Sequence, residues 1–341
     1  MTVRVGVIGT GVMGAEHARI LQGSISGATV TAVADTIYGR AQAVAADTGA
    51  RSFNSAEELI ASPFVDAVLI ASHDSVHAAQ VKACLAEGKP VLCEKPLAPT
   101  TEECQELVAL ESVLAGNPLI SVGFMRRFDP AYRDLKATLR AGGIGQALMV
   151  RSSHRNVHSY PGGDSAATIT NSGIHEIDIT AWLLDSPIDG VSWHAPKSTR
   201  EDTTRQDPQV FHLHTRDGVL SIVDVFVNAR YGYDVRCEVV GETGSLELAG
   251  PRPTIHNRAM GQTRAYAADW RPVFADAYRI QSQAWVDSIA AGTPSPLATA
   301  HDALHATRVA QALIDSMNAG GTTTNVDHGI PAPAQPAQTT P

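Results

Sequence analysis

The chain opens on an apolar segment that runs directly into a glycine-rich turn, VRVGVIGTGVMG. Val3 to Ile8 is β-branched and apolar, as expected of a strand that is buried on both faces of a parallel sheet. Gly9, Gly11 and Gly14 then have the GxGxxG spacing and lead into a helical pattern. In such a turn the first glycine permits the tight bend, the second lets the backbone approach a pyrophosphate, and the third lets the helix pack on the strand. The segment therefore predicts a dinucleotide site, with the phosphates at a helix N-terminus.

An acidic residue ends the second expected strand. Residues 29–34 are mostly β-branched or small, and Asp35 follows them at about 20 residues beyond the glycine turn. A carboxylate there accepts both hydroxyls of the adenosine ribose and repels a 2′-phosphate, which favours NAD over NADP. Arg40 lies nearby in the sequence, so NADP remains an alternative cofactor. The alternative is a structural Rossmann turn with an ordinary surface Asp.

Strands and helices continue to alternate through the first third of the chain. We expect strands at residues 52–53, 65–71, 91–93 and 119–122, and helices at residues 39–48, 56–62, 76–87 and 101–115. This rhythm predicts a doubly wound parallel sheet, and ligands bind at the carboxyl ends of its strands. Ser72, His73, Glu94, Lys95 and residues 124–127 all fall at those ends. Lys95 is therefore expected in the crevice that receives the nicotinamide.

The pattern changes after Pro130. Helices are expected at residues 131–140, 172–184, 276–291 and 302–319, and strands at 148–154, 210–215, 219–228, 235–241 and 245–249. Asp217 and Gly218 are typical of a hairpin turn between two of these strands. Strands this close together leave no room for crossover helices, so they predict an antiparallel sheet. One face of this sheet is expected over the active site and the other against a partner subunit.

The predicted fold class is α/β in two domains. Residues 1–123 would form an NAD-binding Rossmann domain with a doubly wound parallel sheet. Residues 124–320 would form an α+β domain with a large, mainly antiparallel open sheet, for substrate binding and oligomerisation. Residues 329–341, rich in Pro, Ala and Gln, are expected to be disordered.

Composition excludes several classes of protein. The chain has 341 residues and a formal net charge of -9, so no basic surface is expected to bind nucleic acid. No apolar run approaches the roughly 20 residues that a membrane helix needs. The N-terminus enters a strand directly, and we expect no secretion signal. The 4 cysteines show no metal-binding spacing. Reduced thiols in the cytoplasm, and no metal, are the expectation.

Several motifs together resemble the Gfo/Idh/MocA oxidoreductase family, and within it the inositol 2-dehydrogenase branch. They are GVIGTGVMG at residues 6–14, EKP at 94–96, GFMRRFDPAY at 123–132, HEID at 175–178 and YGYDVRCEVVGETGSL at 231–246. The resemblance extends over nearly the whole chain. It implies a Rossmann domain joined to an open-sheet domain, and commonly a homotetramer packed through those sheets.

The resemblance also assigns chemistry to two residues. Oxidation of a secondary alcohol needs a hydride acceptor, a base for the hydroxyl proton and a positive group beside the developing alkoxide. In the family the lysine of EKP and a histidine on the following helix have the last two roles. They match Lys95 and His175, which implies that His175 is the general base and Lys95 its electrostatic partner.

Each assignment has an alternative. Lys95 would otherwise be a surface lysine in a solvated pair with Glu94, and His175 an ordinary helix histidine. A metal site formed by His175, Glu176 and Asp178 is disfavoured because neighbouring positions point to different helix faces.

One position departs from the family pattern. The family usually has an aspartate four residues before the histidine, where this chain has Asn171. An amide is able to orient the imidazole by a hydrogen bond, but it supplies no negative charge to the imidazolium. We therefore expect a lower pKa for His175 than in relatives with Asp, and a different pH–rate profile. A shift in the preferred polyol or a lower turnover is a further consequence that Asn171 could have.

The predicted site is larger than the Lys95–His175 pair. The cofactor-binding set is Gly9, Thr10, Gly11, Val12, Met13, Gly14, Asp35, Arg40, Ser72, His73, His77, Glu94, Lys95 and Arg126. The substrate-binding set is Lys95, Met125, Arg126, His154, Asn171, His175 and Tyr233. For His154 and Tyr233 the alternative is half-buried packing, and Arg127 is a candidate structural arginine paired with Asp129.

These expectations converge on an NAD-dependent dehydrogenase of a cyclic polyol. The resemblance favours oxidation of myo-inositol to 2-keto-myo-inositol (scyllo-inosose). The first alternative is a dehydrogenase of another inositol isomer or of a monosaccharide. The second is a non-catalytic NAD(P)-binding regulator, since the same fold serves that role too. Retention of both Lys95 and His175 argues against the regulator, because a sensor needs the nucleotide site alone.

Overall fold

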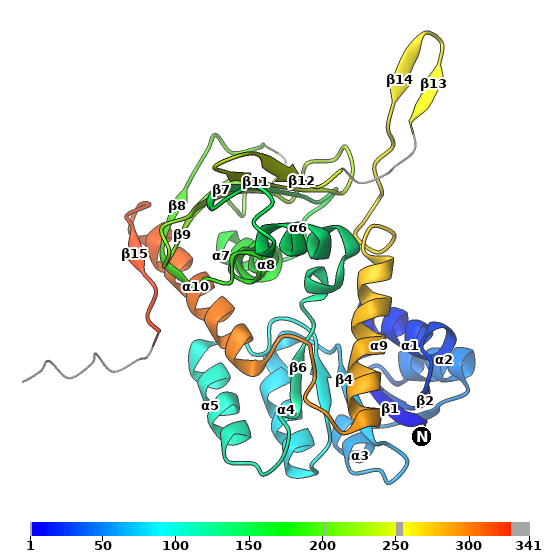
Figure 1. The fold of residues 1–341 in the computed structure, drawn as a ribbon. Coiled ribbons are helices and arrows are strands. Elements are labelled where there is room, and N and C mark those ends of the chain that lie inside the picture. The colour runs from blue at the N-terminus through cyan, green and yellow to red at the C-terminus, as the bar shows by residue number, and fades with distance from the viewer. Residues whose placement is uncertain (1, 201, 250–254, 329–341) are drawn as a thin grey trace, which may run out of the picture.

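The structure is a computed structural model that describes residues 2–200, 202–249 and 255–328. The tail predicted to be disordered, residues 329–341, lies outside these residues. The chain builds two sheets with helices between and around them (Figure 1). Among the helices described, none combines the length and the apolar character that a membrane-spanning segment requires.

The first sheet has six parallel strands in the order β3-β2-β1-β4-β5-β6. Its strands are β1 (Val3–Ile8), β2 (Ala28–Ala34), β3 (Arg51–Phe53), β4 (Ala67–Ile70), β5 (Val91–Cys93) and β6 (Ile120–Val122). Its helices are α1 (Val12–Ser24), α2 (Tyr38–Thr48), α3 (Ala56–Ile60), α4 (His77–Ala86) and α5 (Thr101–Ser112). The strand order reverses between β1 and β4, which places the ligand crevice outside their carboxyl ends. The predicted doubly wound parallel sheet is confirmed.

The second sheet has seven strands in the order β12-β11-β7-β10-β9-β8-β15. They are β7 (Ala147–Arg155), β8 (Ile188–His194), β9 (Gln209–Thr215), β10 (Leu220–Phe226), β11 (Asp234–Gly241), β12 (Ser245–Glu247) and β15 (Thr324–Asn325). Only β7 and β10 pair in parallel, so the mainly antiparallel sheet is confirmed. The Asp217-Gly218 turn joins β9 to β10 as predicted.

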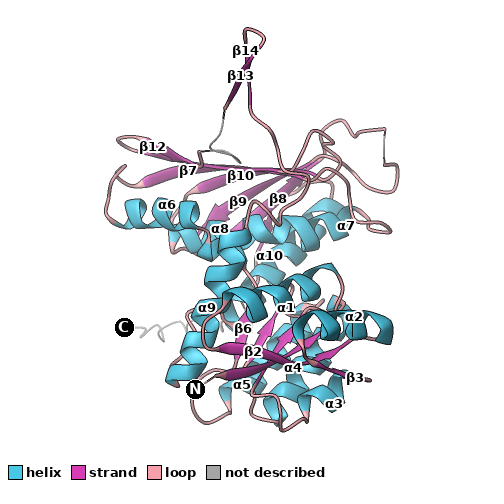
Figure 2. Cartoon of the chain, turned by 90° about the vertical axis from the view of Figure 1, so that its right-hand side faces the viewer, coloured by secondary structure: helices cyan, strands magenta, loops and turns pink. Residues whose placement is uncertain are grey.

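Four strands outside the prediction complete the fold, one of them the short β15 at the edge of the second sheet. β8 joins the sheet although Asp189 and Gly190 interrupt its β-branched pattern. β13 (His256–Arg258) and β14 (Gly261–Thr263) pair as a hairpin that projects away from both sheets (Figures 1 and 2). Its turn residues Ala259 and Met260 have φ of 49° and 57°. These are the left-handed values that a tight hairpin turn needs, here without the glycine that would have marked the turn in the sequence.

Helices cover only one face of the seven-stranded sheet among the described residues. Figure 2 shows α6 (Pro130–Arg140), α7 (Ser165–Thr168), α8 (Ile174–Leu184) and α10 (Ala300–Asn318) between the two sheets. Strand residues that face these helices are buried, such as Val223 and Val225 of β10, whereas the alternating Ile222 and Asp224 are half-buried. The outer face of the sheet is therefore open.

The last two long helices connect the two sheets. Trp285 and Val286 of α9 (Ala275–Ala291) belong to the same buried cluster as Val3 and Val5 of β1. α10 packs against both α5 and β8. Residues beyond 270 thus complete the core of the N-terminal sheet, and the division of the chain at residue 123 stays a prediction.

Candidate active site

The glycine turn leaves room for a ligand at the start of α1. A Cβ on Gly9 would lie 2.5 Å from the Ser72 backbone, and one on Gly14 only 1.6 Å from the carbonyl oxygen of Gly9. These two glycines are required for packing, whereas a Cβ on Gly11 would meet no atom within 4 Å. Gly11 is the N-cap of α1, where backbone N–H groups and the helix dipole favour a phosphate. The loop thus fits the pyrophosphate of a dinucleotide.

Asp35 stands at the carboxyl end of β2 and holds the glycine turn. Its Oδ2 accepts hydrogen bonds from the N–H of Thr10 at 2.7 Å and from the Thr10 hydroxyl at 3.1 Å. Its Oδ1 accepts from the N–H of Ile37 at 2.8 Å. Arg40 is exposed in the first turn of α2. Asp35 therefore has a structural role in the loop in addition to the ribose contact predicted for it.

Two other predicted residues flank the turn on its outer side. Val12 is exposed at the first position of α1, and the sulfur of Met13 lies 3.4 Å from the indole Nε1 of Trp270, which donates to it. Trp270 comes from the segment before α9, so this contact ties the phosphate-binding loop to the second half of the chain.

The loop after β4 is connected to the EKP segment by His77. The Ser72 hydroxyl donates to the side chain of Gln80 at 2.7 Å, and His73 is exposed at the start of η1 (Asp74–Val76). His77 is buried, with Nδ1 2.7 Å from the carbonyl of Pro96 and Nε2 3.2 Å from the carbonyl of Ser72. Burial lowers the pKa of His77, although these carbonyls oppose the effect. Within the predicted cofactor set, His77 thus braces the two strand-end loops.

Lys95 reaches from the end of β5 to the second half of the chain. Its Nζ donates to the backbone carbonyl of Asn171 at 3.0 Å. Glu94 has other partners: its Oε1 lies 2.7 Å from Nε2 of His17, and its Oε2 accepts a hydrogen bond from the N–H of Lys95 at 3.2 Å. Burial lowers the pKa of Lys95, and the negative charges of Glu94 and Asp74 partly offset this effect. The geometry favours a lysine directed into the crevice over a solvated pair with Glu94.

The helix that contains His175 begins earlier than predicted. It was expected from residue 172, but α7 starts at Ser165 and continues through the wide π-turn η3 (Ile169–Gly173) into α8. The Asp164 side chain caps it by accepting from the N–H of Ala167 at 2.8 Å. A Cβ on Gly173 would lie 2.7 Å from the Phe211 ring, so this glycine lets the helix approach β9. π-turns of this kind are frequent at functional sites.

His175 is held in its neutral form. Burial, reinforced by the electrostatic effects of Lys95, Arg126 and His154, lowers the pKa of His175 well below its ordinary value. A neutral imidazole is the protonation state that a general base requires. Asn171 is exposed, and its contact with Lys95 is made by the backbone carbonyl. The orienting role of the Asn171 amide stays a prediction.

A buried charge network lies directly behind His175. Arg126 of η2 (Met125–Phe128) and Glu176 each expose 1% of their side chains and form an ion pair. Nδ1 of His154 lies 3.1 Å from Glu176 Oε2, and its Nε2 lies 3.1 Å from Oδ1 of Asn156. Although burial acts to raise the pKa of Glu176, Arg126 and His154 lower it to about 2.

The other predicted substrate residues adjoin this network. The Tyr233 ring centroid lies 5.8 Å from that of His154, in an edge-to-face arrangement. Burial raises the pKa of Tyr233 to about 12. Met125 is buried in the same cluster as Tyr233. The structure thus brings His154, Tyr233, Met125 and Arg126 together next to His175.

Arg127 is structural, but its partners differ from the one predicted. It pairs with Asp178 at 2.5 Å and with Asp302 at 3.3 Å. Asp129 instead caps α6 by accepting from the N–H groups of Ala131 and Tyr132. The carboxylates of the HEID motif thus both bind arginines. Within the described ranges, no group of three or more acidic, histidine or cysteine side chains is arranged to hold a metal ion.

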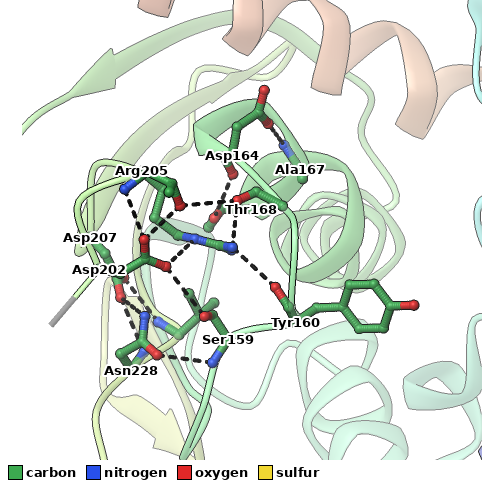
Figure 3. Close-up of polar contacts among 12 residues, drawn as sticks. Ser159, Tyr160, Asp164, Ala167, Thr168, Asp202, Arg205, Asp207 and Asn228 are labelled. Carbon is green, nitrogen blue, oxygen red and sulfur yellow. Dashed lines mark hydrogen bonds and ion pairs between the residues drawn. The ribbon is translucent and has the colours of Figure 1, made fainter.

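Arg205 fixes the loop that leads into α7 (Figure 3). Its Nη2 donates to the carbonyl of Tyr160 at 3.1 Å and to that of Gly163 at 2.5 Å. Asp207 accepts from the N–H of Asn228 at 3.1 Å and from its Nδ2 at 2.8 Å. The Tyr160 ring points away from this cluster and is exposed. The path of the chain between β7 and the helix of His175 is thereby set by buried polar contacts.

Sequence reasoning missed several of these residues. His17 and Glu176 each form an ion pair or hydrogen bond beside Lys95 or His175, and Arg205 lies in a segment without regular structure. His17 had a signal, because it is one helical turn before Leu21 on the inward face of α1. Glu176 lies in the HEID motif, but nothing in the sequence indicated its pairing with Arg126 or the contacts of Arg205, since these partners are distant in the sequence.

A glycine turn at α1, an acid after β2, a lysine after β5 and a histidine on α8 are the features of an NAD-dependent oxidoreductase acting on an alcohol group. Comparison with known proteins confirms this class. Residues 3–117 match the family described as "Oxidoreductase family, NAD-binding Rossmann fold", and residues 132–247 match the Gfo/Idh/MocA C-terminal domain. The chain belongs to the Gfo/Idh/MocA oxidoreductase family.

Individual relatives agree along the whole chain. An inositol 2-dehydrogenase of Paenarthrobacter aurescens is 48% identical over 332 residues, covering 96% of this chain and 100% of the relative. An inositol 2-dehydrogenase/D-chiro-inositol 3-dehydrogenase of Shouchella clausii is 40% identical, covering 99% and 96%. The crystal structure of Lactobacillus casei myo-inositol dehydrogenase with NAD(H) and myo-inositol has a TM-score of 0.92 at 35% identity, covering 98% and 99%. The predicted resemblance and the NAD cofactor are confirmed.

Proposed function

We propose that this protein oxidises a secondary hydroxyl of myo-inositol to give 2-keto-myo-inositol, with reduction of NAD. The observation that supports it most is the 3.0 Å contact between Lys95 Nζ and the Asn171 carbonyl. It joins the strand end of the Rossmann sheet to the helix of His175, so that a hydroxyl between them meets both groups. The names of the P. aurescens relative and of the L. casei complex support inositol as the substrate.

The two side chains divide the chemistry. NAD, when bound, would supply the acceptor for the hydride of the carbinol carbon. The neutral His175 takes the hydroxyl proton, and the Lys95 ammonium stabilises the negative charge that develops on the oxygen. The C–H and O–H bonds break and the C=O bond forms, with the proton retained on the imidazole until solvent removes it. His175 then returns to the neutral form that its low pKa favours.

The cofactor would be held by the residues predicted for it. The N–H groups at the start of α1 bind the pyrophosphate above Gly11, and Asp35 accepts the ribose hydroxyls. Ser72, His73, Glu94 and Arg126 belong to the same proposed set at the strand ends. In the substrate pocket we place Met125, His154 and Tyr233, because the His154 ring lies 6.4 Å from that of His175, Tyr233 packs against His154, and Met125 shares a buried cluster with Tyr233.

Other substrates form the second candidate. The name of the S. clausii relative includes D-chiro-inositol, which favours a site that tolerates more than one inositol isomer. A non-catalytic regulator is less consistent with the structure, because a sensor has no use for a neutral histidine beside a cationic lysine.

A panel assay separates these possibilities. Purified protein is mixed with NAD and, separately, with myo-inositol, scyllo-inositol, D-chiro-inositol, glucose or xylose, and NADH absorbance is followed. Turnover of myo-inositol that is lost in Lys95→Ala and His175→Ala supports the proposal. Turnover of another polyol, without turnover of myo-inositol, would change the assigned substrate and retain the proposed mechanism. NAD binding without turnover of any polyol favours the regulator.

The open sheet face supports a homotetramer. A hollow of about 550 Å³ lies on this face, lined by residues that include Arg151, Asp224, Arg236 and Glu238. Charges of both signs are able to complement a second copy related by twofold symmetry. Light scattering tests this assembly, and Arg236→Glu should weaken it. A cytoplasmic location belongs to the same proposal, since the four cysteines are buried free thiols that suit a reducing compartment.

A further inference from the structure

A buried histidine links the phosphate-binding helix to Lys95. His17 is in the second turn of α1, and its Nε2 lies 2.7 Å from Oε1 of Glu94. The side chains of His17 and Glu94 are 1% and 13% exposed. Glu94 immediately precedes Lys95, so a contact made from α1 acts one residue away from the proposed electrostatic group.

The surroundings of His17 indicate which nitrogen has the proton. Its Nδ1 is buried and has no hydrogen-bond partner among the described residues. A buried lone pair costs less than a buried N–H without an acceptor, so the proton is best placed on Nε2, where it is donated to Glu94. The Tyr278 ring of α9 packs edge-on against the imidazole, with the ring centroids 5.4 Å apart. This packing fixes the ring plane and hence the direction of the donated hydrogen bond.

The Glu94 carboxylate is also held on the side away from His17. Its Oε2 accepts from the N–H of Lys95 at 3.2 Å. A Cβ on Gly123 would lie 3.2 Å from the carboxyl carbon of Glu94, so the adjoining strand end leaves the carboxylate little freedom. The Glu94 carboxylate is therefore fixed between His17 and the Lys95 backbone.

We propose that His17 is a positioning residue for Lys95. Its hydrogen bond holds the Glu94 carboxylate ionised and oriented, and the carboxylate in turn keeps the Lys95 ammonium charged and directed toward Asn171. The inference rests on the proposed function, in which that ammonium binds the reacting hydroxyl. It adds a role for α1 beyond the phosphates, because the same helix then controls a group at the other end of the cofactor.

The charges around Lys95 make Glu94 the contact that matters most. Burial lowers the pKa of Lys95, and Glu94 opposes this more than the next group, Asp74 of η1, does. Arg126 of η2 lowers the same pKa, and Glu176 of α8 raises it. His175 is a further titratable neighbour, and its own pKa is lowered by burial and by the charge of Lys95.

The test compares two substitutions of His17. His17→Leu removes the hydrogen bond, so the Glu94 carboxylate is no longer held in place and its attraction for the Lys95 ammonium weakens. The alkaline fall of kcat/KM for myo-inositol should then begin about one pH unit lower than in the wild type. In His17→Gln the amide is able to donate to Glu94 again, and the profile should return toward that of the wild type. NAD affinity should change less than threefold in both.

A matched variant controls for loss of stability. Leu21 is one turn further along the same face of α1, is fully buried and lies away from Glu94 in the apolar cluster of the first sheet. Leu21→Ala should lower the melting temperature at least as much as His17→Leu and leave the alkaline limb in place. If Leu21→Ala shifts the limb equally, or if His17→Leu does not shift it, His17 has only a packing role and the inference is wrong.

A second measurement is independent of turnover. In the protein without substrate, the rate at which acetic anhydride modifies Lys95 at each pH, followed by mass spectrometry of its peptide, reports the fraction of neutral amine. His17→Leu should move this titration to lower pH, and His17→Gln should restore it. If the wild type turns over no polyol but His17→Leu shows this shift in the Lys95 titration, the proposed function alone is refuted. A wild type that turns over myo-inositol with no shift in His17→Leu refutes the inference alone.

Discussion

The Lys95 ammonium donates to the backbone carbonyl of Asn171 at 3.0 Å, across the boundary between the two halves of the chain. The contact uses the main chain, so the identity of residue 171 does not determine whether it forms. It places the charge of Lys95 next to His175, where it contributes to the low pKa of the imidazole. The Lys–His pair is thus coupled electrostatically before any substrate binds.

Replacing Lys95 should remove catalysis and spare the fold. Lys95→Met is expected to lower kcat/KM for myo-inositol by about 10²–10³-fold, the usual loss when one stabilising donor is removed from a developing oxyanion. NADH absorbance is the measure. Lys89 provides a matched control, because its Nζ binds the carbonyls of Ile60 and Ser62 away from the site. Equal losses in Lys95→Met and Lys89→Met would contradict the role of Lys95.

A carboxylate at residue 171 should move the acid limb of the pH profile. The pKa of His175 lies well below its ordinary value, so the wild type should retain activity into mildly acidic pH. Asn171→Asp adds a negative charge that favours the imidazolium, raises the pKa of His175 and shifts the acid limb of kcat/KM to higher pH. Asn171→Ala serves as the uncharged control. Identical acid limbs in all three proteins would exclude an electrostatic effect of residue 171 on His175.

The buried pair of Arg126 and Glu176 predicts a specific acid sensitivity. The pKa of Glu176 is about 2 in the folded protein against an ordinary value of 4.5. A depressed folded pKa gives stability that is complete above the ordinary value and is lost as the pH falls from 4.5 toward about 2. Glu176→Gln should cost about 3–5 kcal/mol at neutral pH, because Arg126 is left buried without a counter-charge.

Urea unfolding at several pH values tests this prediction. The difference in stability between the wild type and Glu176→Gln should shrink as the pH falls through that window. A difference that stays constant down to pH 2 would show that the carboxylate does not act through its charge. Lys82 of α4 and Glu106 of α5 provide a comparison, because their ion pair is partly exposed, with Nζ and Oε2 2.7 Å apart. Glu106→Gln should cost less than about 1 kcal/mol.

The sequence predicted those features of the fold that depend on local pattern. The glycine turn, the buried strands and the Asp217-Gly218 hairpin each have their cause within a few residues, and all are confirmed. The predicted start of the His175 helix at residue 172 is wrong. The helix begins at Ser165, and this start depends on the Asp164 cap and on the fit of Gly173 against Phe211. That fit belongs to tertiary packing, which periodicity does not report.

Within the site, the sequence indicated residues better than it indicated partners. Lys95 and His175 were indicated by a strand end and by a motif, and their catalytic roles stay predictions. The expected partner of Arg127 was Asp129, only two residues along the chain, whereas the structure pairs it with Asp178 and Asp302. A nearby acid in the sequence is a weak guide to ion pairing, because Asp129 forms a helix cap instead.

Loosening the loop before α7 should affect substrate binding more than chemistry. Arg205→Met removes the donors to the carbonyls of Tyr160 and Gly163, which frees the chain between β7 and α7. We expect KM for myo-inositol to rise about tenfold with a smaller change in kcat, since Lys95 and His175 stay in place. Arg216→Met is the control, because Arg216 pairs with Asp189 in an exposed salt bridge. A fall in kcat with KM unchanged would refute this role for the loop.

Cofactor choice should depend on the charge of Asp35. Asp35→Asn keeps an oxygen for the N–H of Thr10 at a site where the wild-type distance is 2.7 Å, so the glycine turn should survive. Removal of the charge ends the repulsion of a 2′-phosphate, and the preference for NAD over NADP should fall about tenfold or more. The ratio of kcat/KM for the two cofactors measures it. Asp47→Asn, an exposed change on α2, should leave the ratio unchanged. A ratio that is also unchanged in Asp35→Asn would mean that Asp35 acts only as a support for the turn, and that selectivity arises elsewhere at the adenosine end of the crevice.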